Sequence, residues 1–132
     1  MILAINSASE KVSIAIYQPG KIESEVSWES YRTQSREILP KIDKLFKKNN
    51  RALCDLTCVY VNSGPGSFTG LRVGISIANS IGYSLNIPVY GIKNKNSGAG
   101  ALEIAKRKNN ISSYKIKKFL KPILPYYNSP LK

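Results

Sequence analysis

The segment SGPGSFTGLRVG, residues 63–74, joins glycine, proline and hydroxyl residues between two apolar stretches. The apolar run CVYVN precedes it at 58–62, and apolar residues at helical spacing follow it over 69–85. Glycine and proline mark a tight turn, and the hydroxyl of Ser67 or Thr69 can cap the first turn of a helix. The segment therefore predicts a strand, a tight loop and a helix, in that order.

The glycine spacing of this loop fits neither common phosphate-binding motif. A P-loop needs lysine and a hydroxyl residue after its last glycine, whereas leucine and arginine follow Gly70. A dinucleotide fingerprint needs glycines at its first, third and sixth positions; Gly64 and Gly66 fit, but Thr69 is sixth. Weak anion binding at the amino terminus of the helix remains an alternative, because the first backbone N–H groups of a helix have no partner within it. The loop residues concerned are Gly64, Pro65, Gly66, Ser67 and Thr69.

Small residues recur every fourth position along the helix that follows, at Gly70, Gly74, Ala78 and Gly82. A glycine inside a helix costs about 1 kcal/mol relative to alanine, so this stripe needs compensation from close packing. The neighbour that packs there is either the domain's own sheet or a helix of a second chain.

Three strands are expected before residue 30. ILAIN at 2–6 is almost continuously apolar, while VSIAIY at 12–17 and IESEVSW at 22–28 alternate. QPGK at 18–21 has the composition of a hairpin turn. The chain should therefore begin as an antiparallel meander.

Residues 35–48, SREILPKIDKLFKK, show helical spacing of apolar residues. Pro40 fits only if the helix starts near Glu37 or bends at the proline. IPVYGI supplies a further strand at 87–92. Strands that alternate with helices after a meander predict right-handed crossovers and a mixed sheet with a parallel half. We expect an α/β fold with a single ribonuclease-H-like lobe over residues 1–92.

Positive charge is concentrated after this lobe. Residues 1–92 hold ten Lys or Arg against seven Asp or Glu, whereas 93–132 hold ten against one. Residues 93–132 are expected to form a basic tail with a short helix and a terminal strand. Such a tail can follow a nucleic-acid backbone, although a general bias toward lysine explains it equally well. The candidate RNA contacts are Lys106, Arg107, Lys108, Lys117 and Lys118.

Several classes of function are disfavoured by composition. The chain has no histidine, and its two cysteines, Cys54 and Cys58, have no second pair. Neither a metal site nor a disulfide framework is expected, and no cofactor is predicted. The commonest general base is missing as well, which argues against a hydrolase. With no apolar run of membrane-spanning length and no signal-peptide pattern, we expect a cytoplasmic protein.

The segment GPGSFTGLRVG at 64–74, between VYVNS and NIPVYGI, closely resembles the signature of the TsaB family, also called YeaZ. The stretches ILAINSA, SREILPKI and LCDL are also similar to that family, so that the resemblance covers about residues 1–92. TsaB is the scaffold protein of bacterial tRNA threonylcarbamoyladenosine synthesis.

The resemblance implies an actin-like (ASKHA) lobe that is not a catalyst. It implies pairing with the paralogue TsaD, which carries the metal and modifies adenosine 37 of tRNA, in a complex that also includes a TsaE-type ATPase. Pairing with a second copy of the chain is the alternative. In the family the two lobe helices pack against the equivalent pair of the partner. Carried over to this chain, the expected interface residues are Ile38, Leu45, Gly70, Arg72, Gly74, Ala78 and Gly82.

The chain departs from the family pattern at several points. Asn6 stands where the family usually has aspartate, and Gln34 where it often has histidine. Family members are longer and have a second lobe, whereas about forty residues follow Ile92 here, and LKPILPYY resembles the family's closing strand. We therefore expect a shortened scaffold that keeps the partner-binding half. The alternatives are a basic RNA-binding module and a decayed remnant of a protein with glycoprotease-like activity.

Overall fold

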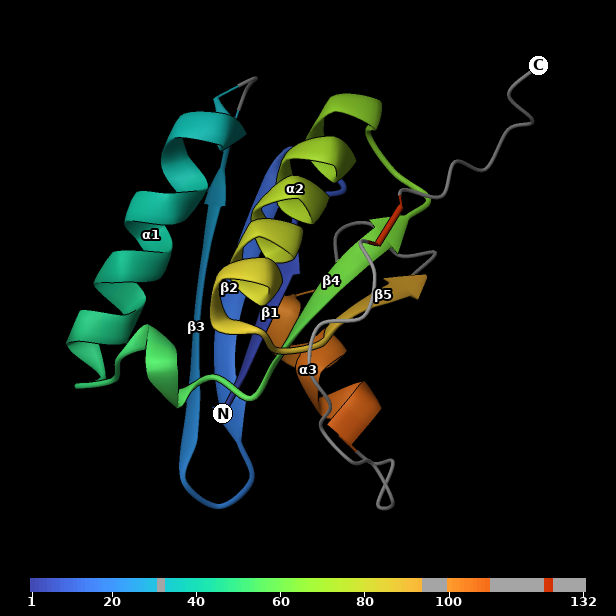
Figure 1. Cartoon of the computed structure of the whole chain (residues 1–132). Helices are drawn as coiled ribbons and strands as arrows, with labels where there is room; N and C mark the ends of the chain where they lie inside the picture. The colour runs from blue at the N-terminus through green and yellow to red at the C-terminus, as the bar shows by residue number, and fades with distance from the viewer. Residues whose placement is uncertain (31–32, 94–99, 110–122, 125–132) are drawn as a thin grey trace.

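The computed structural model describes residues 1–30, 33–93, 100–109 and 123–124. Strands β1 (Ile2–Asn6), β2 (Lys11–Gln18) and β3 (Ile22–Glu29) form an antiparallel meander, as predicted (Figure 1). Gly20 has φ 71° in the turn between β2 and β3, a left-handed conformation that costs glycine little.

Strands β4 (Cys58–Gly64) and β5 (Val89–Lys93) complete the sheet as its parallel half. β4 pairs in parallel with β1 on one side and with β5 on the other, and the strand order is β3-β2-β1-β4-β5. The predicted mixed sheet is therefore confirmed. β1 is central and its five residues are all buried, which is why ILAIN is apolar at its first four positions rather than alternating.

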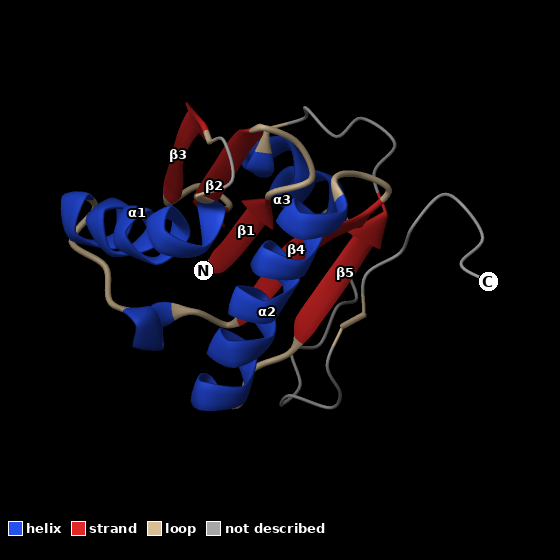
Figure 2. Cartoon of the chain, turned by 90° about the horizontal axis from the view of Figure 1, so that it is seen from above, coloured by secondary structure: helices blue, strands red, loops and turns tan. Residues whose placement is uncertain are grey.

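Helices α1 (Gln34–Lys48) and α2 (Phe68–Leu85) cover one face of the sheet, and α3 (Ala101–Asn109) covers the other (Figures 1 and 2). A short 3-10 helix, η1 (Leu53–Asp55), links α1 to β4. α1 begins at Gln34 and continues through Pro40, so a start near Glu37 is wrong. None of the described helices has the length and apolar character needed to cross a membrane.

Each face of the sheet has its own hydrophobic core. The larger core, between the sheet and α1 and α2, includes Leu3, Ile5 and Leu71. The smaller core, between the sheet and α3, includes Ala4, Tyr60 and Ile104. The short helix expected in the tail thus packs directly on the lobe. The terminal strand proposed for the tail falls largely outside the described residues.

Candidate functional site: the signature loop and the α1–α2 surface

The loop between β4 and α2 is fixed to the turn that follows β1. The backbone N–H of Ser67 donates to the carbonyl of Ala8 at 2.7 Å, and the Ser67 hydroxyl accepts from the N–H of Gly70 at 3.4 Å. Ser67 is therefore the residue that caps α2, and Thr69, which is exposed, lies inside the helix. Gly64 has φ 120°, a conformation that L residues with side chains rarely adopt, and its peptide bond to Pro65 is cis.

The glycines of this region allow a very close approach between α2 and the β1–β2 turn. A methyl group on Gly70 would collide with the Ser7 carbonyl oxygen, and one on Gly74 would collide with the Ser7 hydroxyl. A methyl group on Gly66 would lie 2.6 Å from the Ala8 Cβ. The Ser7 hydroxyl donates to the Gly70 carbonyl at 2.6 Å. Gly70 and Gly74 of the stripe therefore pack on the chain's own β1 and β1–β2 turn, and Ala78 is buried in the larger core.

Two buried asparagines connect the carboxyl ends of β1 and β4. The Asn62 amide donates to Asn6 Oδ1 at 3.0 Å, and Asn62 Oδ1 accepts from the N–H of Gly64 at 2.9 Å. Asn6 Oδ1 also accepts from the N–H of Ala8 at 3.1 Å. Where the resembling family has aspartate, this chain thus has a neutral amide that holds two turns together. Its described residues contain no cluster of three His, Cys, Asp or Glu that could hold a metal.

The start of α1 is anchored to the end of β3 by Glu37. The hydroxyl of Ser30 and the indole N–H of Trp28 both donate to Glu37 Oε1, the latter at 3.3 Å. Hydrogen bonds from Ser30 and then Thr33 lower the pKa of the Glu37 carboxyl. These bonds set the position of α1 beside β3, and with it the surface that α1 presents.

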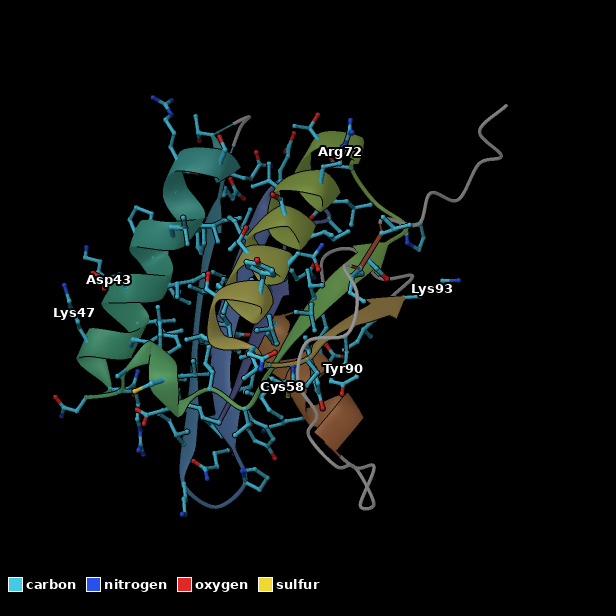
Figure 3. The ribbon with its side chains drawn as sticks, in the orientation of Figure 1. Asp43, Lys47, Cys58, Arg72, Tyr90 and Lys93 are labelled. Carbon is cyan, nitrogen blue, oxygen red and sulfur yellow. The ribbon has the colours of Figure 1, made fainter. Side chains whose placement is uncertain are left out.

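Most of the expected interface residues are buried inside the lobe. Arg72 is the exception, since it lies exposed near the amino terminus of α2 (Figure 3). The others face the chain's own sheet or core, so their side chains are not on the surface. They are Ile38, Leu45, Gly70, Gly74, Ala78 and Gly82.

The open surface of the same two helices has a different composition. A hollow of about 290 Å³ lies between α1 and α2 beside η1, and Leu39 and Leu53 on its rim are 52% and 45% exposed. An adjoining hollow of about 420 Å³ is bordered by Lys47 and Arg51. The α2 residues that line the first hollow are Ser76, Ile77, Ser80, Ile81, Ser84 and Leu85. We define these six residues, with Leu39 and Leu53, as the α1–α2 surface.

Sequence reasoning left the domain's own sheet open as the neighbour of the glycine stripe, but the resemblance assigned the stripe to a partner, and this surface was missed. A signal was present, since Ser76, Ser80 and Ser84 also repeat every fourth residue, on another side of α2. Near the hollow, Lys47 and Asp43 form an exposed ion pair of 2.9 Å along α1 (Figure 3). Exposed pairs of this kind contribute little to stability.

The buried thiol of the lobe is not poised for nucleophilic chemistry. Burial raises the pKa of Cys58 to about 11, which keeps the thiol protonated at neutral pH. Burial also raises the pKa of Tyr60 and of Tyr90, whose rings meet edge to face with centroids 5.8 Å apart. These residues lie on the α3 side of the sheet, away from the α1–α2 surface.

The basic residues proposed for RNA contact fall into two groups. Lys106 lies on α3 and forms an ion pair of 2.6 Å with Glu23 of β3, and this hydrogen bond raises the pKa of Lys106. Arg107 and Lys108 belong to the same helix. Lys117 and Lys118 lie outside the described residues.

Comparison with known proteins places this lobe in a family. A family model described as "TsaD: tRNA N6-adenosine threonylcarbamoyltransferase" matches residues 26–110. The chain belongs to the TsaD family. Two relatives described as "tRNA threonylcarbamoyladenosine biosynthesis protein TsaB" come from Buchnera aphidicola subsp. Schizaphis graminum and Escherichia coli K12. They are 39% and 32% identical over 70% and 69% of this chain. The resemblance to TsaB is thus confirmed.

Solved structures agree with this placement in the TsaD family. "YeaZ from Pseudomonas aeruginosa" matches 70% of the chain with 25% identity and a TM-score of 0.67. A second structure from Pseudomonas aeruginosa, described as an uncharacterized protein "with similarity to peptidase YEAZ", has the same coverage, identity and TM-score. The predicted single ribonuclease-H-like, actin-like lobe is therefore confirmed. This TsaD-family chain spans 43% and 39% of the length of the Buchnera and Escherichia relatives.

Proposed function

We propose that this chain is a non-catalytic scaffold subunit in the formation of N6-threonylcarbamoyladenosine in tRNA, and that it binds and activates a TsaD-type paralogue. The names of its TsaB relatives support a place in that biosynthesis. The observation that carries the scaffold role is the exposed, hollowed and largely apolar α1–α2 surface.

A scaffold role is supported by the chemistry of the lobe. The sequence has no histidine, and burial keeps the Cys58 thiol protonated. The asparagines at the ends of β1 and β4 are neutral and already bonded to each other. A nucleophile needs an adjacent base or a depressed pKa, and these groups offer neither.

The α1–α2 surface has the properties of a helix-docking site. Leu39 and Leu53 are half exposed, so covering each of them contributes about half of the roughly 1.5–3 kcal/mol that complete burial of a leucine side chain gives. The small side chains of Ser76, Ser80 and Ser84 allow the backbone of a partner helix to approach α2 closely. A helix pair of the partner can therefore pack across α1 and α2 without any change in the lobe.

Co-purification with a TsaD-type protein from the same organism tests the proposal. Leu39→Asp and Ser80→Arg place a charge on the α1–α2 surface without touching the core, and each should weaken association by about tenfold or more. Ser27→Arg is the matched control, because Ser27 is exposed on β3 and belongs to the other side of the sheet.

Melting curves must show that all three variants fold like the native chain. Equal binding by the native chain and both surface variants would overturn the proposal. Binding of the native chain only to itself, measured by light scattering and lost in the same variants, would assign the surface to a homodimer and reject the TsaD-type partner.

A further inference from the structure

The amide side chain of Asn79, on α2, holds a residue that lies 44 positions further along the chain. Asn79 Nδ2 donates to the carbonyl oxygen of Ile123 at 2.9 Å, and Asn79 Oδ1 accepts from the N–H of Ile123 at 2.9 Å. A neighbouring β-strand would offer one donor and one acceptor in the same way. Asn79 thus recognises the main chain of the segment and is indifferent to which side chain it carries.

Gly91 of β5 provides the space for the side chain of Ile123. A methyl group on Gly91 would lie 2.7 Å from Ile123 Cγ2, closer than carbon atoms approach each other. Glycine weakens the interior of a strand and commonly marks a site that another group approaches closely. Ile123 is that group here, and it packs against the larger core.

The position of Ile123 explains how the last strand is covered. On the face that carries α1 and α2, Val89 of β5 is buried in the larger core, and Gly91 follows it on the same side. The segment of residues 123–124 lies beside β5 in the view from above (Figure 2). Ile123 therefore extends the apolar layer over the edge strand.

We propose that Asn79 and Gly91 form a docking slot for residues 123–124 of this same chain, with Ile123 as the anchor residue. The slot fastens Ile123 to the lobe between α2 and β5. Because the α1–α2 surface includes neither residue, this interaction is separate from the proposed partner site. α2 then has two binding sides, one for its own chain and one for a partner.

Amide-resolved hydrogen exchange of the full chain by NMR tests the slot. Pro122 and Pro125 have no amide hydrogen, so Ile123 and Leu124 give the only backbone amide signals between them. We expect the Ile123 amide to exchange about tenfold or more slowly than that of Leu124, because the Ile123 N–H donates to Asn79 Oδ1 and the Ile123 carbonyl accepts from the same amide group.

Two kinds of variant separate the parts of the slot. Asn79→Leu keeps a similar volume but removes both hydrogen bonds, and should abolish the protection of Ile123. Gly91→Val leaves Asn79 intact but fills the space of the Ile123 side chain, and should also abolish it. Ser80→Ala, on the neighbouring position of α2, is the control for this measurement and should leave the exchange of Ile123 unchanged. Protection of the Leu3 amide in β1 must stay native in all three, which shows that the lobe is folded.

Equal exchange of Ile123 and Leu124 in the native chain would overturn the proposal. So would protection of Ile123 that survives Asn79→Leu. If the protection instead rises with protein concentration, together with a dimer in light scattering that Asn79→Leu abolishes, the segment docks on a second copy and the proposed arrangement within one chain is wrong.

Discussion

Gly74 is the residue whose role is most clearly fixed by its surroundings. An added methyl group would meet the Ser7 hydroxyl, which already donates to the Gly70 carbonyl. We expect Gly74→Ala to lower the free energy of unfolding by about 1–3 kcal/mol through overpacking. Urea unfolding measures this, with Ser76→Ala on the exposed side of α2 as a control that should stay within about 0.5 kcal/mol. An unchanged free energy of unfolding in Gly74→Ala would contradict the close packing of α2 on the β1–β2 turn.

The two cysteines should differ sharply in reactivity. Cys54 is exposed on η1, whereas Cys58 is buried in β4 with a pKa raised to about 11. Only a deprotonated and accessible thiol reacts rapidly with an alkylating reagent. We therefore expect iodoacetamide to modify one thiol per native chain near neutral pH and both thiols in denaturant, as counted by intact mass. Modification of Cys58 in the native chain would show that β4 opens readily.

At the scale of elements, α3 depends on groups from two strands. Its first N–H groups donate outside the helix, that of Ala101 to the Ser13 hydroxyl at 2.9 Å and that of Leu102 to a Glu25 carboxylate oxygen at 2.8 Å. A negative charge at a helix amino terminus contributes about 0.3–1 kcal/mol. The attachment of α3 to the sheet is therefore partly electrostatic.

Neutralising that charge should loosen α3 selectively. We expect Glu25→Gln to speed amide exchange in α3 by about twofold to fivefold, in line with a loss of about 0.3–1 kcal/mol, and to leave β1 unchanged. Glu10→Gln, at an exposed carboxylate before β2, is the matched control. Unchanged exchange in α3 would mean that the charge of Glu25 does not contribute to holding the helix.

Elements were easier to predict than the contacts between them. Alternation and helical spacing are local, so all five strands and α1 and α2 were predictable to within about three residues. The orientation of the glycine stripe could not be predicted from local pattern. It depends on Ser7, a turn residue that contacts α2 only in the folded lobe. The contact of Asn79 with Ile123 joins residues 44 positions apart, and no local pattern indicates it.

At the scale of the whole molecule, the uneven charge predicts how tRNA binding should depend on salt. Lys106 is already paired with Glu23, so Lys106→Ala should change the salt dependence little. Replacing Lys117 and Lys118 together by alanine should reduce the slope of log affinity against log salt by about 0.7–0.9 for each phosphate that the tail no longer neutralises. A titration by fluorescence anisotropy measures both. The absence of any binding by the native chain at low salt would reject an RNA-binding role for the tail.

The placement of α3 also has a consequence for synthesis on the ribosome. Strands β1 and β2 emerge early, yet the side of the sheet that carries Ala4 and Ala15 is covered by residues 101–109, which emerge much later. During that interval the nascent sheet exposes an apolar face, the kind of surface on which chaperones act. The order of translation therefore leaves this apolar face of the sheet uncovered until α3 has been synthesised.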